Sequence, residues 1–339
     1  MTLKAPFPWF GGKSKVTREV WRRFGDVPNY IEPFFGSGAV LLGRPEFDGN
    51  RIETVNDADG HLSNFWRALQ ADPDGVARYA SYPVSELDLH ARGDWLFYRP
   101  DVFEWVEQLR GDPDYYDVKS AGWWVWFVSC WIGGLPSIDK PQRKSGTVSR
   151  NRPHLWGAGM GVNRKRPHLG DAGRGVHRSM PGDRLEHLTA YMRQLAARLE
   201  RVRICCGDWS RVTGPSVTYK NGLTAVFLDP PYSAEAGRNN GLYSTESATV
   251  AHDAREWALT NGDNPLMRIA LCGYDGEGHE TLTEHGWHAY AWKAHGGYGS
   301  QGNGAGRENK HREVIWFSPH CINPVDTLPL FAANGYTQS

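Results

Sequence analysis

The chain has 339 residues, enough for one large domain or two modest ones, and 40% of them are hydrophobic, which allows a sizeable core. Its 38 Lys and Arg balance its 38 Asp and Glu, so the average charge points to no class of partner. The five cysteines form no C-x-x-C pair and no stretch approaches a membrane span. We therefore expect reduced thiols in a soluble, cytoplasmic protein that has no membrane partner.

The first 70 residues alternate between helical and strand patterns. Apolar residues at helical spacing predict a helix over 14–24. Residues 30–33 predict a short buried strand, and a helix is expected from about residue 39. Residues 51–55 predict a second strand, with a helix over 60–70. This strand–helix–strand–helix order is typical of a parallel α/β sheet.

The middle of the chain changes character twice. Residues 75–130 read as mostly helical, whereas residues 133–182 are rich in Gly, Pro, Arg, Lys and His and have no periodicity. From 140 to 178 there are ten Lys and Arg against a single acid, Asp171. Composition alone leaves two interpretations open, a basic loop without regular structure and a contact surface for nucleic acid.

The last third again predicts strands. Apolar runs at 202–206, 225–228 and 268–272 have strand length. Two further runs at 287–292 and 314–317 have no helix-length segment between them, so we expect an antiparallel hairpin at the sheet edge. The predicted fold is therefore α/β, with a mostly parallel sheet.

A glycine turn follows the first predicted strand. Gly36 and Gly38 would let the backbone turn tightly and approach a ligand closely. Asp57 lies 19 residues after Gly38, where an acid can hold ribose hydroxyls. Leu41 replaces the third glycine of a dinucleotide fingerprint, which favours a nucleoside without phosphates. An ordinary glycine turn explains these residues equally well.

The tetrapeptide Asp229-Pro230-Pro231-Tyr232 directly follows the apolar run 225–228. Two prolines stiffen the backbone and fix the Asp229 carboxylate and the Pro230 carbonyl at the carboxyl end of the strand. Both groups are acceptors, as an exocyclic amine such as that of adenine requires, and Tyr232 offers a face for stacking a base. The alternative is a proline turn with a solvated carboxylate.

Three motifs together carry a family resemblance. In order and spacing, PFPWFGGK at 6–13, EPFFGSG at 32–38 and DPPY at 229–232 resemble the Dam-type (D12 class) N6-adenine DNA methyltransferases, over about residues 4–318. The resemblance implies a Rossmann-like S-adenosylmethionine-dependent methyltransferase fold with a helical, loop-rich DNA-recognition insertion. We expect four parts: the two catalytic parts 1–74 and 200–320, the recognition region 75–199 and a flexible tail 321–339.

The resemblance also implies a site. Lys13 would face the methionine carboxylate of the donor, Glu32 its amino group and Asp57 its ribose, while Cys205 and Asp208 would border its adenine. The expected cofactor-binding residues are Trp9, Gly12, Lys13, Glu32, Pro33, Phe34, Gly36, Gly38, Asp57, Cys205, Asp208 and Asp229. The expected catalytic residues, which would hold a flipped-out adenine, are Asp229, Pro230, Pro231 and Tyr232.

The expected partner is double-stranded DNA, because the basic stretch falls where the family places its DNA-reading segment. The expected DNA-binding residues are Arg143, Lys144, Arg150, Arg152, Arg164, Lys165, Arg166, Arg307 and Lys310. We expect a metal-independent monomer, in a bacterial, archaeal or phage-infected cell, with a separately encoded restriction nuclease as a potential partner. The DNA sequence that it recognises does not carry over from the family, because the insert differs in composition.

Two other functions remain open at this point. A DNA cytosine-N4 methyltransferase would also methylate an exocyclic amine, although such enzymes more often carry Ser at the first position of the Pro-Pro-Tyr motif. A non-catalytic DNA-binding module with a methyltransferase fold is the alternative from another class. Asp229, Asp57 and Lys13 are all intact, which argues against a decayed site.

Overall fold

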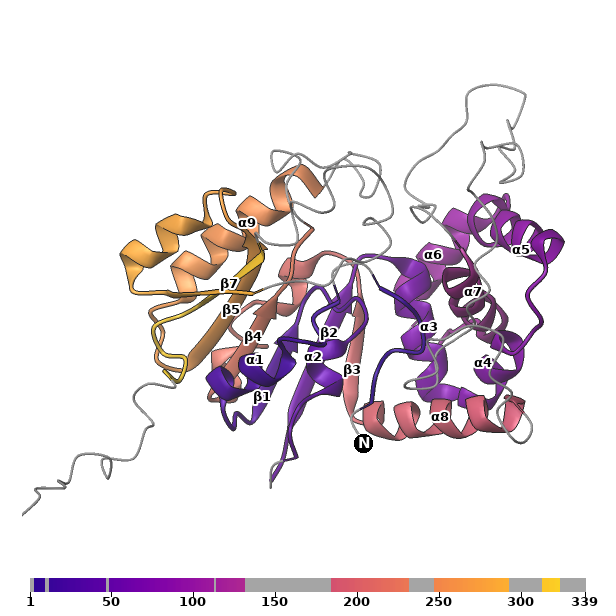
Figure 1. Cartoon of the computed structure of the whole chain (residues 1–339), viewed down its shortest axis with the longest axis horizontal. Helices are drawn as coiled ribbons and strands as arrows, with labels where there is room; N and C mark the ends of the chain where they lie inside the picture. Colours follow the sequence, from indigo (N-terminus) through magenta and orange to yellow (C-terminus); the bar gives the residue numbers. More distant parts are fainter. Residues whose placement is uncertain are drawn as a thin grey trace, which may run out of the picture.

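A computed structural model describes residues 3–9, 12–46, 49–112, 114–131, 184–231, 247–292 and 313–323. Within these ranges the centre of the molecule is a seven-stranded sheet with the order β3-β2-β1-β4-β5-β7-β6 (Figure 1). The strands are β1 Asn29–Glu32, β2 Ile52–Asp57, β3 Val202–Cys206, β4 Thr224–Leu228, β5 Met267–Tyr274, β6 His288–Ala291 and β7 Glu313–Phe317.

The strand pairing confirms the predicted fold class. Strands β1 to β5 run parallel to one another, whereas β7 runs antiparallel to β5 and β6 runs antiparallel to β7. The expected antiparallel hairpin thus closes one edge of the sheet. Every residue of β1 and β4 is buried, as in parallel sheets that are covered on both faces.

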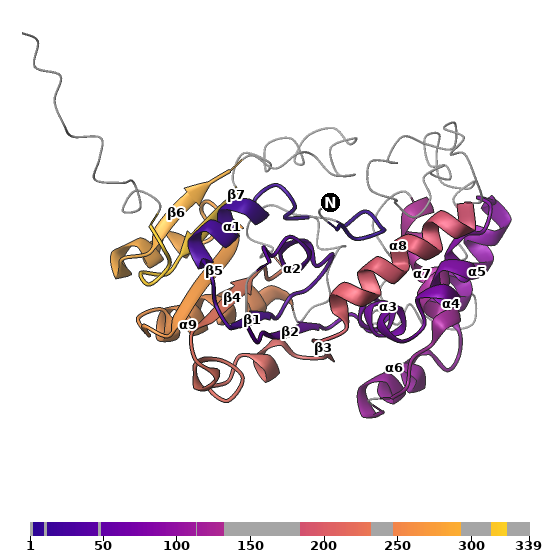
Figure 2. The same cartoon turned by 90° about the horizontal axis from the view of Figure 1, so that it is seen from below.

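Helices cover both faces of the sheet. The helices α1 and α2 lie on one face and α9 on the other, which is clearest in the view from below (Figure 2). The helices are α1 Thr17–Phe24, α2 Ala39–Leu42, α3 Gly60–Ala71, α4 Pro73–Ala80, α5 Glu86–Tyr98, α6 Val102–Gly111, α7 Val118–Cys130, α8 Arg184–Leu199 and α9 Ser247–Asn261. Short 3-10 turns are η2 Trp209–Val212, η3 Tyr219–Asn221 and η5 His279–His285.

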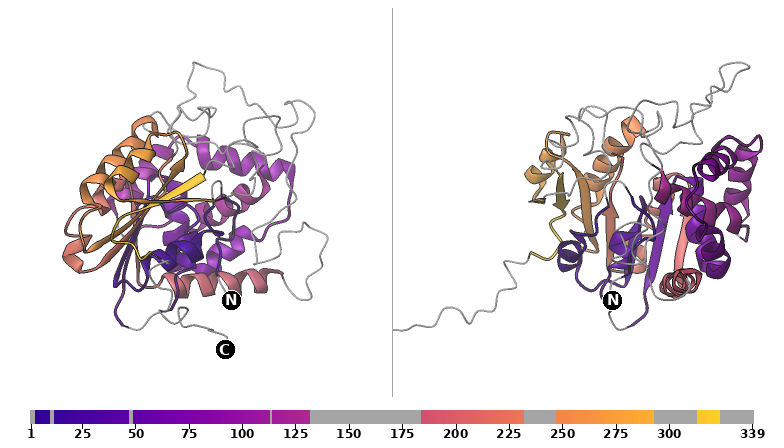
Figure 3. Two further views of the ribbon diagram at one scale, coloured as in Figure 1. Left: turned by 60° about the vertical axis from the view of Figure 1, so that its left-hand side comes forward. Right: turned by 45° about the vertical axis from the view of Figure 1, so that its right-hand side comes forward.

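The helices α3 to α8 form a unit beside the β3 edge of the sheet (Figure 3). Its centre is the aromatic run of α7, where Trp124 and Trp126 are buried. Phe7 from the N-terminal segment packs edge-on against Trp124, with ring centroids 5.0 Å apart. This contact fixes Phe7 of the N-terminal segment against the helical unit.

The helix after the glycine turn and the second strand begin and end close to where the sequence predicts. The helix α2 has four residues and ends before Gly43, where a Cβ atom would come within 2.2 Å of Thr17 Cγ2 on α1. Only glycine allows this close approach of the two segments. Strand β2 ends at Asp57, and Asn56 and Asp57 pair with Cys205 and Cys206 of β3.

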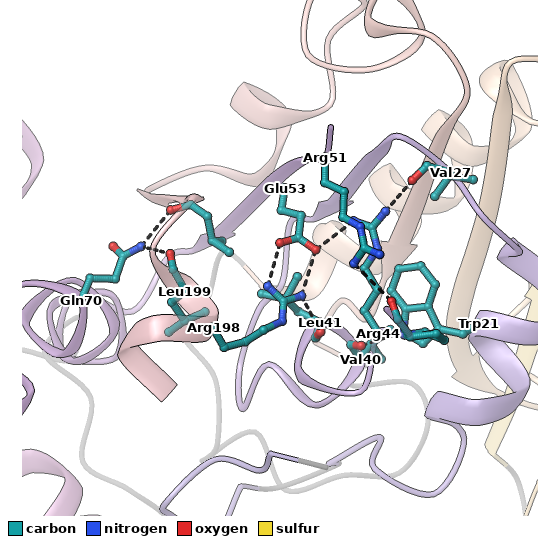
Figure 4. A network of polar contacts seen from close by, with 12 residues as sticks. Trp21, Val27, Val40, Leu41, Arg44, Arg51, Glu53, Gln70, Arg198 and Leu199 are labelled. Carbon is teal, nitrogen blue, oxygen red and sulfur yellow. Dashed lines mark hydrogen bonds and ion pairs between the residues drawn. The ribbon is translucent and has the colours of Figure 1, made fainter. Parts of the chain in front are cut away.

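A buried ion network fastens α8 to the sheet (Figure 4). Glu53 on β2 accepts hydrogen bonds from Arg44 Nη1 at 2.8 Å and from both terminal nitrogens of Arg198 at 2.8 and 2.9 Å. Arg44 also donates to the carbonyl of Val27, and Arg198 to the carbonyl of Leu41. Burial alone would raise the pKa of Glu53, but the hydrogen bonds and charges of the two guanidinium groups hold it below its ordinary value.

Candidate active site at the carboxyl edge of the sheet

The parallel strands β1 to β5 all end at one edge of the sheet, called the carboxyl edge here. Strands β1 and β4 are neighbours at its centre, with β2 beyond β1 and β5 beyond β4. The strand order thus reverses between β1 and β4, and α/β sheets bind ligands at such a switch point. Glu32 is the last residue of β1, and Asp229 directly follows β4. The fold brings two motifs together that lie almost 200 residues apart in the sequence.

The glycine turn after β1 is tied to the end of β2. The backbone N–H of Gly36 donates to Asp57 Oδ2 at 3.0 Å, and Asp59 N–H donates to Asp57 Oδ1 at 3.0 Å. Gly36 and Gly38 have φ of 48° and 61°, which favour glycine. Desolvation raises the pKa of Asp57 from its ordinary value, against the hydrogen bonds from the backbone. Asp57 therefore shapes the turn, and its predicted ribose contact stays a prediction.

Trp9 lies directly against this turn. A Cβ atom on Gly36 would come within 2.5 Å of Trp9 Nε1, and one on Gly38 within 2.6 Å of the Phe35 ring. The turn is thus packed so closely that neither glycine has room for a side chain. Gly12, at the other end of the N-terminal motif, is exposed.

Glu32 is a buried carboxyl group on the strand below the turn. Only 3% of the residue is exposed, and Tyr30 Oη donates to Glu32 Oε2 at 2.8 Å. Burial raises the pKa of Glu32 well above its ordinary value, and the nearby negative charges of Asp229 and Asp57 raise it further. A cationic ligand at this edge would favour the ionised form of the group.

Asn56 connects the turns after two strands. Its side-chain amide donates to the carbonyl of Pro33, which is buried, at 3.1 Å and to the carbonyl of Gly207 at 2.9 Å. Since Pro33 follows β1 and Gly207 follows β3, one amide holds both segments in place beside the end of β2.

The segment after β3 adds an aromatic contact. Phe34 and Trp209 lie with ring centroids 5.8 Å apart and an interplanar angle of 31°. Trp209 was missed as a candidate, because nothing in the sequence shows that its ring meets Phe34.

Cys205 is half-buried, and burial raises the pKa of its thiol. Asp208 is exposed, and its Oδ1 accepts from the backbone N–H of Ser210 at 2.9 Å, so it caps the η2 turn.

A charged cluster lies beside β4 and β5. The ammonium of Lys13 is 2.9 Å from Asp229 Oδ1 and 3.8 Å from Glu313 Oε2, and 4% of the Lys13 side chain is exposed. The same ammonium lies 6.0 Å from the centroid of the Trp292 ring. The predicted contact of Lys13 with a methionine carboxylate stays a prediction. Glu313 and Trp292 were missed as site candidates because they reach this edge only through the pairing of β7.

Of the two prolines after Asp229, Pro230 is buried and Pro231 is half-buried. Several predicted residues lie outside the described ranges, so their roles stay predictions. They are Tyr232 and the expected DNA-binding residues Arg143, Lys144, Arg150, Arg152, Arg164, Lys165, Arg166, Arg307 and Lys310.

Residues 9–120 match the family model described as D12 class N6 adenine-specific DNA methyltransferase. This part of the chain, about a third of its length, is therefore similar to that family. The D12 match contains residues 9–13 of the N-terminal motif, with Lys13, and the whole glycine turn at 32–38.

Two curated relatives show how far the similarity reaches beyond the D12 match. The DNA N-6-adenine-methyltransferase of Escherichia phage P1 is 35% identical over 66 residues, which are 20% of this chain and 8% of that protein. The Type II methyltransferase M.MjaIII of Methanocaldococcus jannaschii is 22% identical over 248 residues, 68% of this chain and 70% of that protein. The chain therefore matches only a small part of the phage protein and more than two thirds of the archaeal one.

The described ranges contain no group of three or more His, Cys, Asp or Glu side chains that is placed to hold a metal ion. None of the helices that the structure describes is long and apolar enough to span a membrane.

Proposed function

We propose that the chain is a site-specific DNA adenine-N6 methyltransferase, which transfers a methyl group from S-adenosylmethionine to a flipped-out adenine in duplex DNA. The observation that carries the proposal is the meeting of three motifs at one edge. The Asp229-Pro230-Pro231 segment follows β4 beside the Glu32 end of β1, and Lys13 of the N-terminal motif is ion-paired with Asp229.

The residues at the carboxyl edge fit the methyl donor. The donor carries a sulfonium and an ammonium group, and the carboxyl groups of Glu32, Asp57 and Asp229 all stand at the carboxyl ends of neighbouring strands. Glu32 would hold the amino group of the donor and Asp57 its ribose. The tight turn at Gly36, which packs against Trp9, and the Phe34–Trp209 pair would lie beside the bound donor. When bound, the donor supplies a methyl group that its positive sulfur already activates.

The chain's own groups would position the adenine. Asp229 and the carbonyl of Pro230 accept the two N–H bonds of the exocyclic amine, and Tyr232 stacks on the base. The amine lone pair forms the new N–C bond as the C–S bond breaks with its electrons moving to sulfur, and the nitrogen then loses a proton to solvent. Positioning and polarisation of the amine supply most of the rate, so we propose a reaction that needs no metal.

Substrate recognition is the second part of the proposal. Residues 75–199 and the basic residues within 140–178 would contact duplex DNA, chiefly its phosphates. Extracting the base costs a few kcal/mol of stacking and pairing, which these contacts offset. The name of the archaeal relative suggests a restriction–modification role and a separate nuclease as partner. We further propose a monomer that acts in the cytoplasm.

Nucleoside mass spectrometry tests the reaction. The intact protein, Asp229→Ala and Asp263→Ala would be expressed in a host without its own DNA methylases, followed by digestion of the DNA. Asp263 is an exposed acid away from the carboxyl edge, so its variant is the matched control. We expect N6-methyladenine from the intact protein and the control but not from Asp229→Ala. Detection of N4-methylcytosine would overturn the assignment of adenine as the target base. If the intact protein produced no methylated base, the proposed reaction would be overturned.

A further inference from the structure

The charged cluster of Lys13, Asp229 and Glu313 contains one residue to which the proposed reaction gives no role. Glu313 Oε2 lies 3.8 Å from the ammonium that Asp229 Oδ1 contacts at 2.9 Å. The carboxylate of Glu313 is therefore placed on the same lysine as the carboxylate that would receive the adenine amine. The inference below rests on the proposed function.

The sheet topology explains how the three residues meet. Strand β5 lies between β4 and β7. Because β7 is antiparallel to β5, its first residue, Glu313, pairs with Tyr274 at the end of β5 and so comes to the carboxyl edge. Lys13 extends to this edge from the segment before α1, where its carbonyl accepts hydrogen bonds from the N–H groups of Val16 and Thr17.

A buried thiol between the strands reports the same arrangement. Cys272 on β5 pairs with Ile315 of β7 and is 1% exposed. Its pKa is raised well above the ordinary value, first by burial and then by the charges of Asp229 and Glu313, while Lys13 lowers it. The charged groups that act on this thiol include the three that the distances join, Lys13, Asp229 and Glu313.

Exposure separates the roles of the three charged side chains. The side chains of Lys13 and Glu313 are 4% and 6% exposed, whereas that of Asp229 is 22% exposed. A buried ammonium must be compensated by carboxylates, and its position follows from where they lie. Asp229 is the most exposed of the three side chains and is therefore the one that a substrate reaches, whereas Lys13 and Glu313 are buried.

We propose that Glu313 is a positioning residue of the methyl transfer, which holds the Lys13 ammonium against Asp229 and so fixes the orientation in which Asp229 receives the adenine amine. Glu313 touches neither substrate and acts through Lys13. Without its charge the attraction of the ammonium to Asp229 is no longer balanced by Glu313, and the Asp229 carboxylate changes its orientation. Because a misplacement of about 1 Å can lower a rate by two orders of magnitude, the effect falls on the chemical step.

The test compares Glu313→Gln, Glu313→Asp and the intact protein in single-turnover methylation of duplex DNA carrying the mapped site, with saturating S-adenosylmethionine. Glu313→Gln keeps the size of the side chain and removes its charge. We expect the single-turnover rate to fall about tenfold. The dissociation constants of donor and DNA should change less than about twofold, and Glu313→Asp should recover part of the rate. Glu256→Gln, an exposed acid on α9, is the matched control.

A double-mutant cycle with Lys13→Gln tests the route of the effect. If Glu313 acts through Lys13, adding Glu313→Gln to Lys13→Gln should lower the single-turnover rate no further. A full rate for Glu313→Gln, a loss confined to donor affinity, or an undiminished effect in the Lys13→Gln background would each overturn the inference. Thermal unfolding of each variant separates misfolding from slow chemistry. An intact protein that methylates no DNA overturns the proposed function, and this inference with it.

Discussion

The hydroxyl of Tyr30 and the carboxyl group of Glu32 lie 2.8 Å apart on the same face of β1, one strand residue between them. This pair is fully inside the protein at the point where β1 reaches the carboxyl edge. Burial keeps the pKa of Glu32 well above its ordinary value. The same carboxyl group ionises at a lower pH in the unfolded chain than in the folded protein. Because burial of the ionised form is unfavourable, we expect Glu32 to contribute to ligand binding and not to the stability of the fold.

Replacing Glu32 should therefore separate binding from stability. The unfolded chain loses the proton of Glu32 at a lower pH than the folded chain, so the folded state loses stability as pH rises above the ordinary value of about 4.5. Glu32→Gln has no such group and should unfold at a higher temperature at pH 7. It should also weaken donor binding about tenfold or more, because a charge-assisted hydrogen bond is lost. Calorimetric titration and thermal scans measure both quantities.

Tyr30→Phe is the matched variant for this prediction. It removes the hydroxyl that supports the carboxyl group while the acid remains, so it should lower the unfolding temperature and weaken donor binding less than Glu32→Gln does. Donor affinity that is unchanged in Glu32→Gln would contradict the predicted role of this acid.

Gly36→Ala should disturb the glycine turn for two reasons. The residue has φ of 48°, which costs a side-chain-bearing residue about 1–2 kcal/mol, and the new Cβ would meet Trp9 Nε1 at 2.5 Å. We expect a loss of stability in urea together with weaker donor binding. Gly49→Ala is the control, since Gly49 has φ of 97° but nothing within 4 Å of a Cβ. Equal losses in both variants would show that the contact with Trp9 is unimportant.

Asn56→Ala should loosen the turns after β1 and β3 at once. Its amide donates at 3.1 Å to the Pro33 carbonyl and at 2.9 Å to the Gly207 carbonyl, and losing these partners should cost about 1–3 kcal/mol. Asn221→Ala is a suitable comparison, because that amide also donates to two carbonyls, both at 3.0 Å. Both variants should lose stability in urea, but only Asn56→Ala should lose donor affinity. Donor binding at full strength in Asn56→Ala would argue against its role at the site.

The Glu53 network should make stability depend on pH. The pKa of Glu53 is lowered in the folded state, so its stabilisation is present above the ordinary value of about 4.5 and is lost as pH falls through the folded pKa. Glu53→Gln leaves two guanidinium groups without a charged partner and should lose about 3–5 kcal/mol at pH 7, with a smaller difference at about pH 3. Thermal unfolding at both pH values measures this.

The exposed pair of Asp74 and Arg193 serves as a comparison for that prediction. Two hydrogen bonds of 2.7 and 2.6 Å join the two side chains at the surface. Asp74→Asn should change the unfolding temperature little, because solvent screens exposed pairs. If it changed the temperature as much as Glu53→Gln does, burial would not explain the network.

Local sequence patterns predicted most of the framework but only part of the site. The runs at 202–206 and 225–228 became β3 and β4 with at most one residue of difference. Every residue of β4 is buried, as expected for a continuous apolar run of strand length. The acid Asp229 and the turn at 32–38 were found for the same reason, because they directly follow such strands.

Contacts between distant segments escaped prediction. The position of Glu313 at the carboxyl edge depends on the antiparallel register of β7 with β5, which no local pattern encodes. The meeting of Phe34 with Trp209 likewise depends on β1 and β3 both flanking β2. An acid directly before an apolar strand, as in Glu313 before Val314, is a signal that could have drawn attention to this residue.

The Lys13–Asp229–Glu313 cluster also bears on how the protein is made. A ribosome adds about 5–20 residues per second, so Glu313 emerges roughly 15–60 seconds after Lys13 has been synthesised. Throughout that interval the nascent chain can form the glycine turn and its helices, but the cluster lacks its last acid. On the proposed role of Glu313, a translation product that stops before β7 would be a poor methylase even with the three recognised motifs present. Fully active enzyme would then appear only when the last strand of the sheet has been added.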